Sequence, residues 1–239
     1  MRRLHFLAAI LMAAMSMQAQ REKPIPVGTA ELQTSADTDG QQYYLYCKAG
    51  AFFYTSGNNW GTQATQGARG SQIYFRPFTD KDETEWDGNR FTIRNHISDT
   101  KGWNDVFITD NYLVNDCSGR GNNVWAAEKN GDEYQFYAAK FSASAFDEET
   151  YGQRVYIGYV PNDGTTTLQP TGIISEAVPV DWTLVKSADY EAWVVEAELY
   201  QLAEELKADI DETKEAYPDS TSASWRPSTT TQAAPRSLS

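Results

Sequence analysis

The chain is poor in the side chains that most often do chemistry, with two histidines and two cysteines among 239 residues. A Ser/His or Cys/His nucleophile would have to be built around His96, since the other histidine, His5, falls in an apolar N-terminal stretch. The chain has no HExxH, CxxC or Gly-Lys-Ser/Thr phosphate loop, and no GxGxxG after a strand. Two facing acids could still support glycoside hydrolysis, which needs only a carboxylate pair. We expect no enzyme and no cofactor, with His96 as a structural residue.

Positive charge is also scarce, with 20 Lys and Arg against 33 Asp and Glu, a formal net charge of −13. Binding of a polyphosphate needs clustered cations that release counterions, so we expect no nucleic-acid partner. Anionic membrane surfaces are disfavoured for the same reason.

The N-terminal residues read as a secretory signal peptide. Arg2 and Arg3 precede the apolar run Leu4 to Met17, and the small Ala19 offers a cleavage point before polar residues. The run is too short for a confident membrane anchor, so we expect no membrane span in the mature chain. We therefore expect residues 1–19 to be removed from an exported protein that is periplasmic, displayed on the cell surface or extracellular. Loss of the two arginines would change the net charge from −13 to −15.

Two features raise the question of a disulfide or a metal. Export permits a disulfide between Cys47 and Cys117, and the alternative is two buried free thiols. The acidic stretch DKDETEWDG, residues 80–88, could attract Ca²⁺, but its order does not match an EF-hand loop. We expect a solvated acidic turn there and no metal site.

A polar lead-in over residues 20–40 gives way to strand-like segments that repeat three times within residues 41–186. Each copy opens on an aromatic-rich strand, continues with an apolar one and closes on a third. The opening strands are QQYYLYC (41–47), NRFTIRN (89–95) and QRVYIGY (153–159). The second strands are FFYTSG (52–57), NYLVNDC (111–117) and TTTLQPTG (165–172). The closing strands are IYFRPF (73–78), EYQFYAA (133–139) and DWTLVK (181–186). Short alternating strands separated by turns such as Asn130-Gly131 predict a closed all-β body. The threefold repetition predicts a mainly β, β-trefoil-like domain.

The pattern changes at Ser187, where an amphipathic helix is predicted over residues 187–217. Val195, Leu199, Leu202, Leu206 and Ile210 recur at spacings of three and four and form one apolar stripe. Tyr190, Trp193 and Ala197 widen the stripe where the helix is expected to dock on the β domain. The acids are expected to be a solvated face, and the alternative is a stalk or partner surface. Residues 218–239 are rich in Ser, Thr and Pro, which predicts a disordered tail.

The stretch YYLYCKAGAFFYTSGNNWGTQATQG, residues 43–67, resembles a segment of large secreted proteins of gut bacteria. In those proteins it opens a ricin-B-like β-trefoil module that is followed by a helical region and lies beside carbohydrate-active domains. The resemblance is densest over residues 41–66, continues as a pattern to Lys186, and implies an architecture whose function is generally unassigned. The Gln-x-Trp repeats of ricin-type sugar sites are missing, and only Asp181-Trp182 is found near the third closing strand.

The tryptophans are the remaining residues to be considered for a structural or ligand-binding role. Trp60 and Trp125 each follow an Asn-Asn pair in the similar stretches SGNNWGTQA and GRGNNVWAAE, so we expect both to be structural. We expect Trp182 in the core as well.

Trp103 differs because it lies in SDTKGWND, a polar insertion found only in the second copy. An indole beside amides and carboxylates suits a sugar, whose C–H faces stack on the ring while its hydroxyls take hydrogen bonds. The expected ligand-binding residues are Trp103, Asn104 and Asp105, with Trp86 second; the alternative for Trp103 is a half-buried loop anchor. The sequence thus predicts an exported, non-catalytic binding module whose first expected ligand is a glycan. The alternative is a protein-interaction or structural spacer module that uses the C-terminal helix to hold a protein partner.

Overall fold

The computed structural model describes residues 22–56, 62–79, 90–116, 122–140 and 145–216, and it is dominated by β-strands. The strands are β1 (Tyr43–Cys47), β2 (Ala51–Thr55), β3 (Thr62–Gly67), β4 (Ile73–Pro77), β5 (Phe91–Ser98), β6 (Gly102–Ile108), β7 (Leu113–Asp116), β8 (Val124–Asn130), β9 (Glu133–Ala138), β10 (Ile157–Tyr159), β11 (Gln169–Pro170), β12 (Val178–Pro179) and β13 (Trp182–Lys186). The helices are α2 (Glu148–Tyr151) and α3 (Ser187–Ala216). All strands belong to a compact unit of residues Ile25–Val195, while α3 from Glu196 onward is assigned to a second unit.

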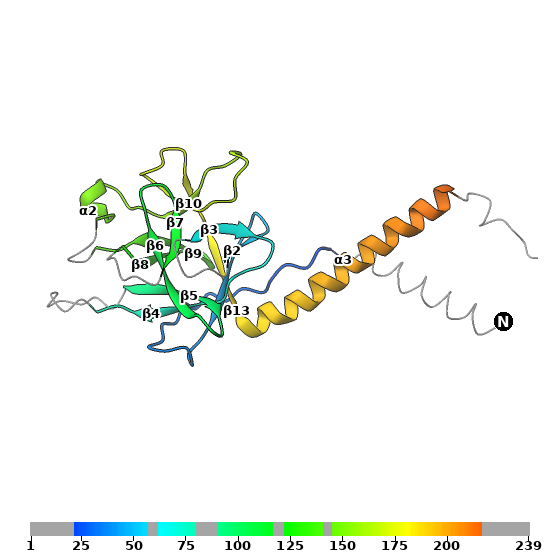
Figure 1. Ribbon diagram of the computed structural model, residues 1–239, viewed down its shortest axis with the longest axis horizontal. Helices are drawn as coiled ribbons and strands as arrows, with labels where there is room; N and C mark the ends of the chain where they lie inside the picture. Colours follow the sequence, from blue (N-terminus) through cyan, green and yellow to red (C-terminus); the bar gives the residue numbers. More distant parts are fainter. Residues whose placement is uncertain (1–21, 57–61, 80–89, 117–121, 141–144, 217–239) are drawn as a thin grey trace, which may run out of the picture. The chain divides into compact units, whose positions relative to one another are not determined.

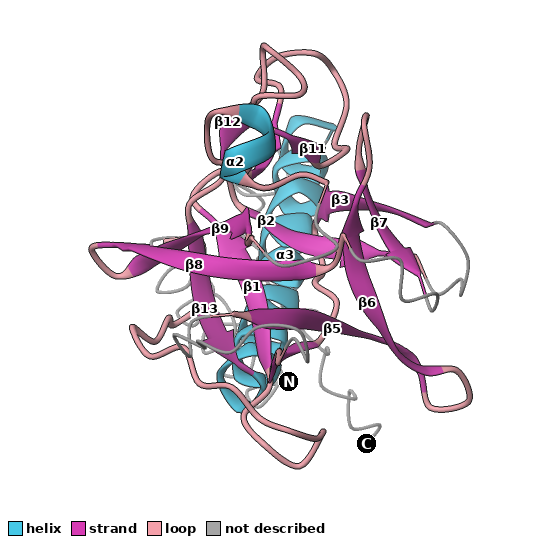
Figure 2. Ribbon diagram, turned by 90° about the vertical axis from the view of Figure 1, so that its left-hand side faces the viewer, coloured by secondary structure: helices cyan, strands magenta, loops and turns pink. Residues whose placement is uncertain are grey.

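Six of the strands close into a barrel. Strand β1 pairs with β4, β4 with β5, β5 with β8, β8 with β9, β9 with β13, and β13 returns to β1, every pairing being antiparallel. The return pairing is long, running from Tyr43 opposite Lys186 to Cys47 opposite Trp182. Closure leaves the barrel strands without an exposed edge. Figures 1 and 2 show these strands from two sides.

Three hairpins complete the domain, one in each repeat. They are β2–β3, β6–β7 and β10–β11, each inserted between two barrel strands. A six-stranded barrel with three such hairpins is the β-trefoil arrangement, so the prediction of a mainly β, threefold-repeated fold with a C-terminal helix is confirmed.

The predicted division into copies is wrong in its details, because the first two repeats have four strands each rather than three, and the third has five, including the two-residue β12 that pairs with β10. The segment EYQFYAA forms β9, which opens the third repeat instead of closing the second. The segment QRVYIGY contains β10, the second strand of that repeat rather than its first. NYLVNDC and TTTLQPTG contain β7 and β11, which are third strands, and the true closer of the second repeat is β8. Strands β10 and β11 have three and two residues, too short to show a periodicity.

Large aromatic side chains fill the barrel. Trp125, Trp182, Phe75 and Phe136 are fully buried, and the rings of Phe75 and Phe136 stack with their centroids 5.4 Å apart. The predicted structural assignments of Trp125 and Trp182 are therefore confirmed, whereas Trp60 lies outside the described residues. Because the Asn-Asn pairs precede β3 in the first repeat and β8 in the second, the two stretches are not equivalent by symmetry.

The first turns of α3 pack on the outside of the β domain through aromatic contacts. The Tyr190 ring stacks on Tyr44 with centroids 3.5 Å apart and meets the edge of Phe52 at 5.1 Å. Its hydroxyl accepts a hydrogen bond from the Gly70 backbone N–H at 3.0 Å, and Trp193 packs against Phe52 at 4.9 Å. The predicted docking through Tyr190 and Trp193 is therefore observed.

Candidate functional site

Trp103, the first predicted ligand contact, lies near the start of strand β6, next to the turn of the β5–β6 hairpin, rather than in a loop. Its indole is half-buried between two aromatic neighbours, with Tyr74 edge-on at 5.0 Å and His96 at 4.9 Å. The Nε2 atom of His96 lies 3.6 Å from a carboxylate oxygen of the exposed Asp99. Much of the surface of Trp103 is thus in contact with protein.

The two polar residues after Trp103 are buried, with Asn104 3% and Asp105 8% exposed. Each carboxylate oxygen of Asp105 already has a partner: Nη1 of Arg94 donates to one at 2.7 Å, and Nδ2 of Asn123 donates to the other at 2.6 Å. The second guanidinium nitrogen of Arg94 donates to the Trp103 carbonyl oxygen at 2.6 Å. The structure therefore brings the three predicted residues together, but two of them are turned to the interior, and contact of this set with a ligand stays a prediction.

Other predicted features lie wholly or partly outside the described residues. Trp86, the acidic stretch 80–88 and Cys117 are all in undescribed segments. The Cys47 side chain is buried on β1, and burial raises the pKa of its thiol. The bridge to Cys117 stays a prediction. Among the residues that are described, no group of three or more His, Cys, Asp or Glu side chains is placed to hold a metal ion.

A groove of about 370 Å³ lies on the outside of the barrel, where the second repeat meets the third on strands β8 and β9. We call it the β8–β9 groove. It is lined by alanines, one tyrosine and three charged side chains, namely Ala126, Ala127, Ala138, Ala139, Tyr137, Arg90, Lys140 and Glu148.

The groove follows from the alternation of side chains along paired strands. In the β8–β9 register Trp125 lies opposite Ala138 and Ala126 opposite Tyr137. Directly opposed residues of an antiparallel pair share a face, and successive residues alternate between faces. Trp125 fills the barrel, so Ala126 and Tyr137 belong to the outer face. A small residue beside a large one leaves a hollow with Tyr137 as its wall.

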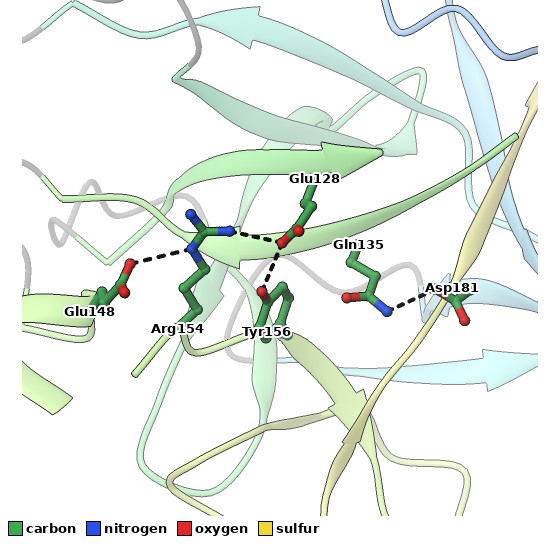
Figure 3. A network of polar contacts seen from close by, with 6 residues as sticks. All are labelled: Glu128, Gln135, Glu148, Arg154, Tyr156 and Asp181. Atoms are coloured by element: carbon green, nitrogen blue, oxygen red, sulfur yellow. Dashed lines mark hydrogen bonds and ion pairs between the residues drawn. The ribbon is translucent and has the colours of Figure 1, made fainter. Parts of the chain in front are cut away.

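Three charged side chains, Arg154, Glu128 and Glu148, are joined to one another by ion pairs (Figure 3). The Arg154 guanidinium lies over the Tyr137 ring, 4.5 Å from its centroid. It donates from Nη1 to Glu128 at 2.8 Å and from Nε to Glu148 at 3.3 Å. The Tyr156 hydroxyl donates to the same Glu128 oxygen at 2.9 Å, and burial raises the pKa of that phenol.

Glu148 reaches this network because the short helix α2 is fixed at its start. Asp147 is only 4% exposed and caps α2, accepting hydrogen bonds at 2.9 Å from the backbone N–H and the hydroxyl of Thr150. The preceding Phe146 is buried in the main core and stacks on Tyr151 at 5.9 Å. The cap and this anchor hold the helix next to the groove.

These residues escaped the sequence analysis, because Glu128, Glu148 and Arg154 belong to separate segments and no local motif links them. Only strand register, which sequence does not specify here, shows that Glu128 and Tyr137 share the outer face. The alternation in EYQFYAA predicts a strand, but it does not show which of its side chains face the barrel interior and which face outward.

The arrangement suits binding of a hydroxyl-rich molecule. Ion pairing fixes the donors and acceptors in advance, which lowers the conformational entropy lost when a ligand binds. The partly exposed carboxylates of Glu128 and Glu148, 48% and 62% exposed, can still accept hydrogen bonds.

In the described part of the chain, no helix is long and apolar enough to cross a bilayer.

Comparison with known proteins finds only solved structures with a low level of structural similarity to this chain. No family model matches the chain, and no curated protein sequence matches it. Among solved structures it is similar to a lectin of Polyporus squamosus bound to the human-type influenza-binding epitope Neu5Acα2-6Galβ1-4GlcNAc, at 16% identity and a TM-score of 0.42, over 65% of this chain and 50% of that one.

Two further structures show a similar level of likeness. They are the lysenin pore, at 13% identity and a TM-score of 0.42 over 65% of this chain and 49% of that one, and the botulinum neurotoxin serotype D ligand-binding domain in complex with N-acetylneuraminic acid, at 11% identity and a TM-score of 0.39 over 66% and 43%. The match spans half or less of each of these three chains. At these TM-scores the likenesses carry no argument about this protein, whose fold rests on its own strand pairings.

Proposed function

We propose that the protein is an exported, non-catalytic binding module that takes a carbohydrate in the β8–β9 groove. The observation that carries this proposal is the combination of an alanine-floored hollow, the Tyr137 wall and the ion-paired Arg154, Glu128 and Glu148 beside it. An aromatic side chain contacts the apolar face of a sugar, and charged groups bind its hydroxyls.

Binding explains this site better than hydrolysis does. A glycosidase needs one carboxyl group that gives up a proton and a second that acts on the sugar. Glu128 and Glu148, the carboxylates next to Tyr137, are both bound to the same Arg154 guanidinium. That arrangement holds the two groups still and engages both, as a binding surface requires.

The β8–β9 groove also meets the needs of a sugar site better than the surroundings of Trp103. The carboxylate of Asp105 is enclosed and fully engaged, whereas those of Glu128 and Glu148 reach solvent. Trp103 therefore serves as the competing site in the test.

A glycan array probed with the purified protein, with and without calcium, tests the proposal. We expect specific binding that is lost on Tyr137→Ala and retained on Trp103→Ala. Tyr54→Ala is the matched control, because Tyr54 is a 39% exposed tyrosine on β2 that does not line the groove. Binding lost only in Trp103→Ala would move the site to the β5–β6 hairpin, and a blank array would contradict the function.

A second candidate function is the binding of a protein partner by α3. The observation that favours it is the exposure of Leu199, Leu202 and Leu206, at 56%, 61% and 42%. Large apolar side chains gathered on one face of a soluble helix often mark an interaction surface. This candidate is independent of the groove, and both functions can coexist in one chain.

A further inference from the structure

The distal part of α3 presents a narrow apolar seam. Leu199, Leu202 and Leu206 follow one another at spacings of three and four, which correspond to positions a, d and a of a heptad repeat. All three are exposed, the least of them by 42%. A seam only two positions wide is the width that one partner helix covers, whereas packing on a globular core calls for a broader stripe.

The surroundings of the seam are acidic. Residues Ser187–Ala216 contain ten Asp and Glu against two Lys, a net charge of −8. In the heptad that places Leu199 at position a, Glu205 and Glu212 occupy g positions, which flank the seam and face the partner's e or g positions. Both are exposed, and Glu205 accepts a hydrogen bond at 2.9 Å from the Gln201 side chain one turn earlier on its own helix.

This charge decides between the two kinds of helix that could cover the seam. A second copy of α3 would bring two helices of charge −8 together. In an antiparallel pair, g positions face g positions and glutamates oppose one another; in a parallel pair, Glu205 faces Ile210 and gains no ion pair. A helix with Lys or Arg beside its own apolar seam would neutralise these carboxylates along the whole contact.

We propose that the leucine seam of α3 binds an amphipathic helix of another protein whose apolar residues repeat at spacings of three and four and are flanked by Lys and Arg. The proposal rests on the second candidate function and defines the partner by its chemistry. Apolar contact supplies the affinity, while the flanking charges select a basic partner over a second copy.

The test uses the purified full chain and three labelled synthetic peptides of about three heptads each. The first peptide has Leu at a and d and Lys at e and g. The second keeps the leucines and has Glu at e and g, and the third keeps the lysines and has Ser at a and d. Fluorescence anisotropy measures the affinity of each peptide, and sedimentation velocity reports whether the chain associates with itself.

We expect the Leu/Lys peptide to bind at least about tenfold more tightly than either of the others, and more weakly as salt is raised. Leu202→Gln should weaken that binding about tenfold or more, because an apolar contact at the centre of the seam is lost. Ala208→Gln is the matched control, since Ala208 is exposed on the same helix away from the seam, and it should leave the affinity unchanged.

Four results would overturn the proposal. Equal binding of the Leu/Lys and Ser/Lys peptides would mean that charge alone acts. Equal binding of the Leu/Lys and Leu/Glu peptides would retain α3 as a partner surface but reject a basic partner. Self-association abolished by Leu202→Gln would make a second copy the occupant. Binding of no peptide would reject the second candidate function together with this inference, and would leave the groove proposal untouched.

Discussion

Two tryptophans of the barrel core offer a matched test of how buried polar atoms affect the stability of this protein. Trp125 and Trp182 are both 0% exposed. The indole N–H of Trp125 donates to the Val106 carbonyl at 2.9 Å, whereas that of Trp182 has no partner among the described residues. We therefore expect Trp125→Phe to destabilise the protein more than Trp182→Phe does.

The expected difference in the free energy of unfolding follows from the different surroundings of the two indole N–H groups. Each substitution removes the same atoms from a fully enclosed site, so the loss of packing is similar and largely cancels. Trp125→Phe also loses a hydrogen bond with a net value of about 1 kcal/mol, while Trp182→Phe removes an unpaired N–H whose burial costs roughly 1–3 kcal/mol. The free energies of unfolding should thus differ by about 2–4 kcal/mol, or about 4–16 °C in Tm for a domain of this size.

Urea unfolding followed by far-UV circular dichroism measures this difference without relying on tryptophan fluorescence, which both substitutions alter. Equal slopes of the free energy against urea would show that the two variants unfold from comparable states. If Trp182→Phe costs as much as Trp125→Phe or more, the reasoning from the unpaired indole is wrong.

Three further predictions concern other contacts. Tyr190→Ala should lower the free energy of unfolding, measured in urea, by about 3–5 kcal/mol, because it removes the ring stacked on Tyr44. Tyr190→Phe should cost only about 1 kcal/mol, because it removes only the hydroxyl that accepts a hydrogen bond from Gly70. Equal effects of the two substitutions would contradict the stacking argument. Asp105→Asn should cost about 2–4 kcal/mol, because Arg94 loses the charge it faces at 2.7 Å, and a thermal shift near zero would refute this. Chiefly through burial, the pKa of Tyr44 is raised to about 12. The folded chain therefore keeps a proton that the unfolded chain releases above pH 10, and the free energy of unfolding should fall as pH rises from about 10 to 12. A urea midpoint that stays constant across that range would contradict this prediction.

Features that depend on local sequence were predictable. The turn predicted at Asn130-Gly131 does join β8 to β9, but its two central residues are Gly131 and Asp132, because Asn130 ends β8 and pairs with Glu133. Gly131 has a φ of +65°, as a glycine at the first central position of a tight hairpin turn allows. Asn162 and Gly164, whose residue types tolerate the left-handed region, also have positive φ values of 62° and 76°. The docking of α3 on the β domain was also predictable, because Tyr190 and Trp193 lie one turn apart on a single face of the helix.

Features that depend on pairing between distant strands were not predictable. Aromatic-rich runs mark strands, but they do not show which strand lies next to which, so β9 was placed in the wrong repeat. The same limit applies to Asp105, which looked like a free carboxylate in a polar segment. The pairing of Arg94 opposite Asp105 across β5 and β6 is what buries it.

The β8–β9 groove depends on three elements meeting, which explains why the predicted site fell on Trp103 instead. Glu128 comes from β8, Glu148 from α2, and Arg154 from the segment before β10. Each residue alone looks like an ordinary surface charge. Their common position beside Tyr137 appears only once the barrel has closed.

The measurement that most directly tests the proposed function is a calorimetric titration of the strongest array glycan into the wild-type protein and its Tyr137→Ala and Tyr54→Ala variants. The groove proposal predicts saturable binding to the wild type and to Tyr54→Ala, with a loss of about tenfold or more in Tyr137→Ala at unchanged circular dichroism. Equal affinity in all three proteins would contradict the assignment of carbohydrate binding to the β8–β9 groove.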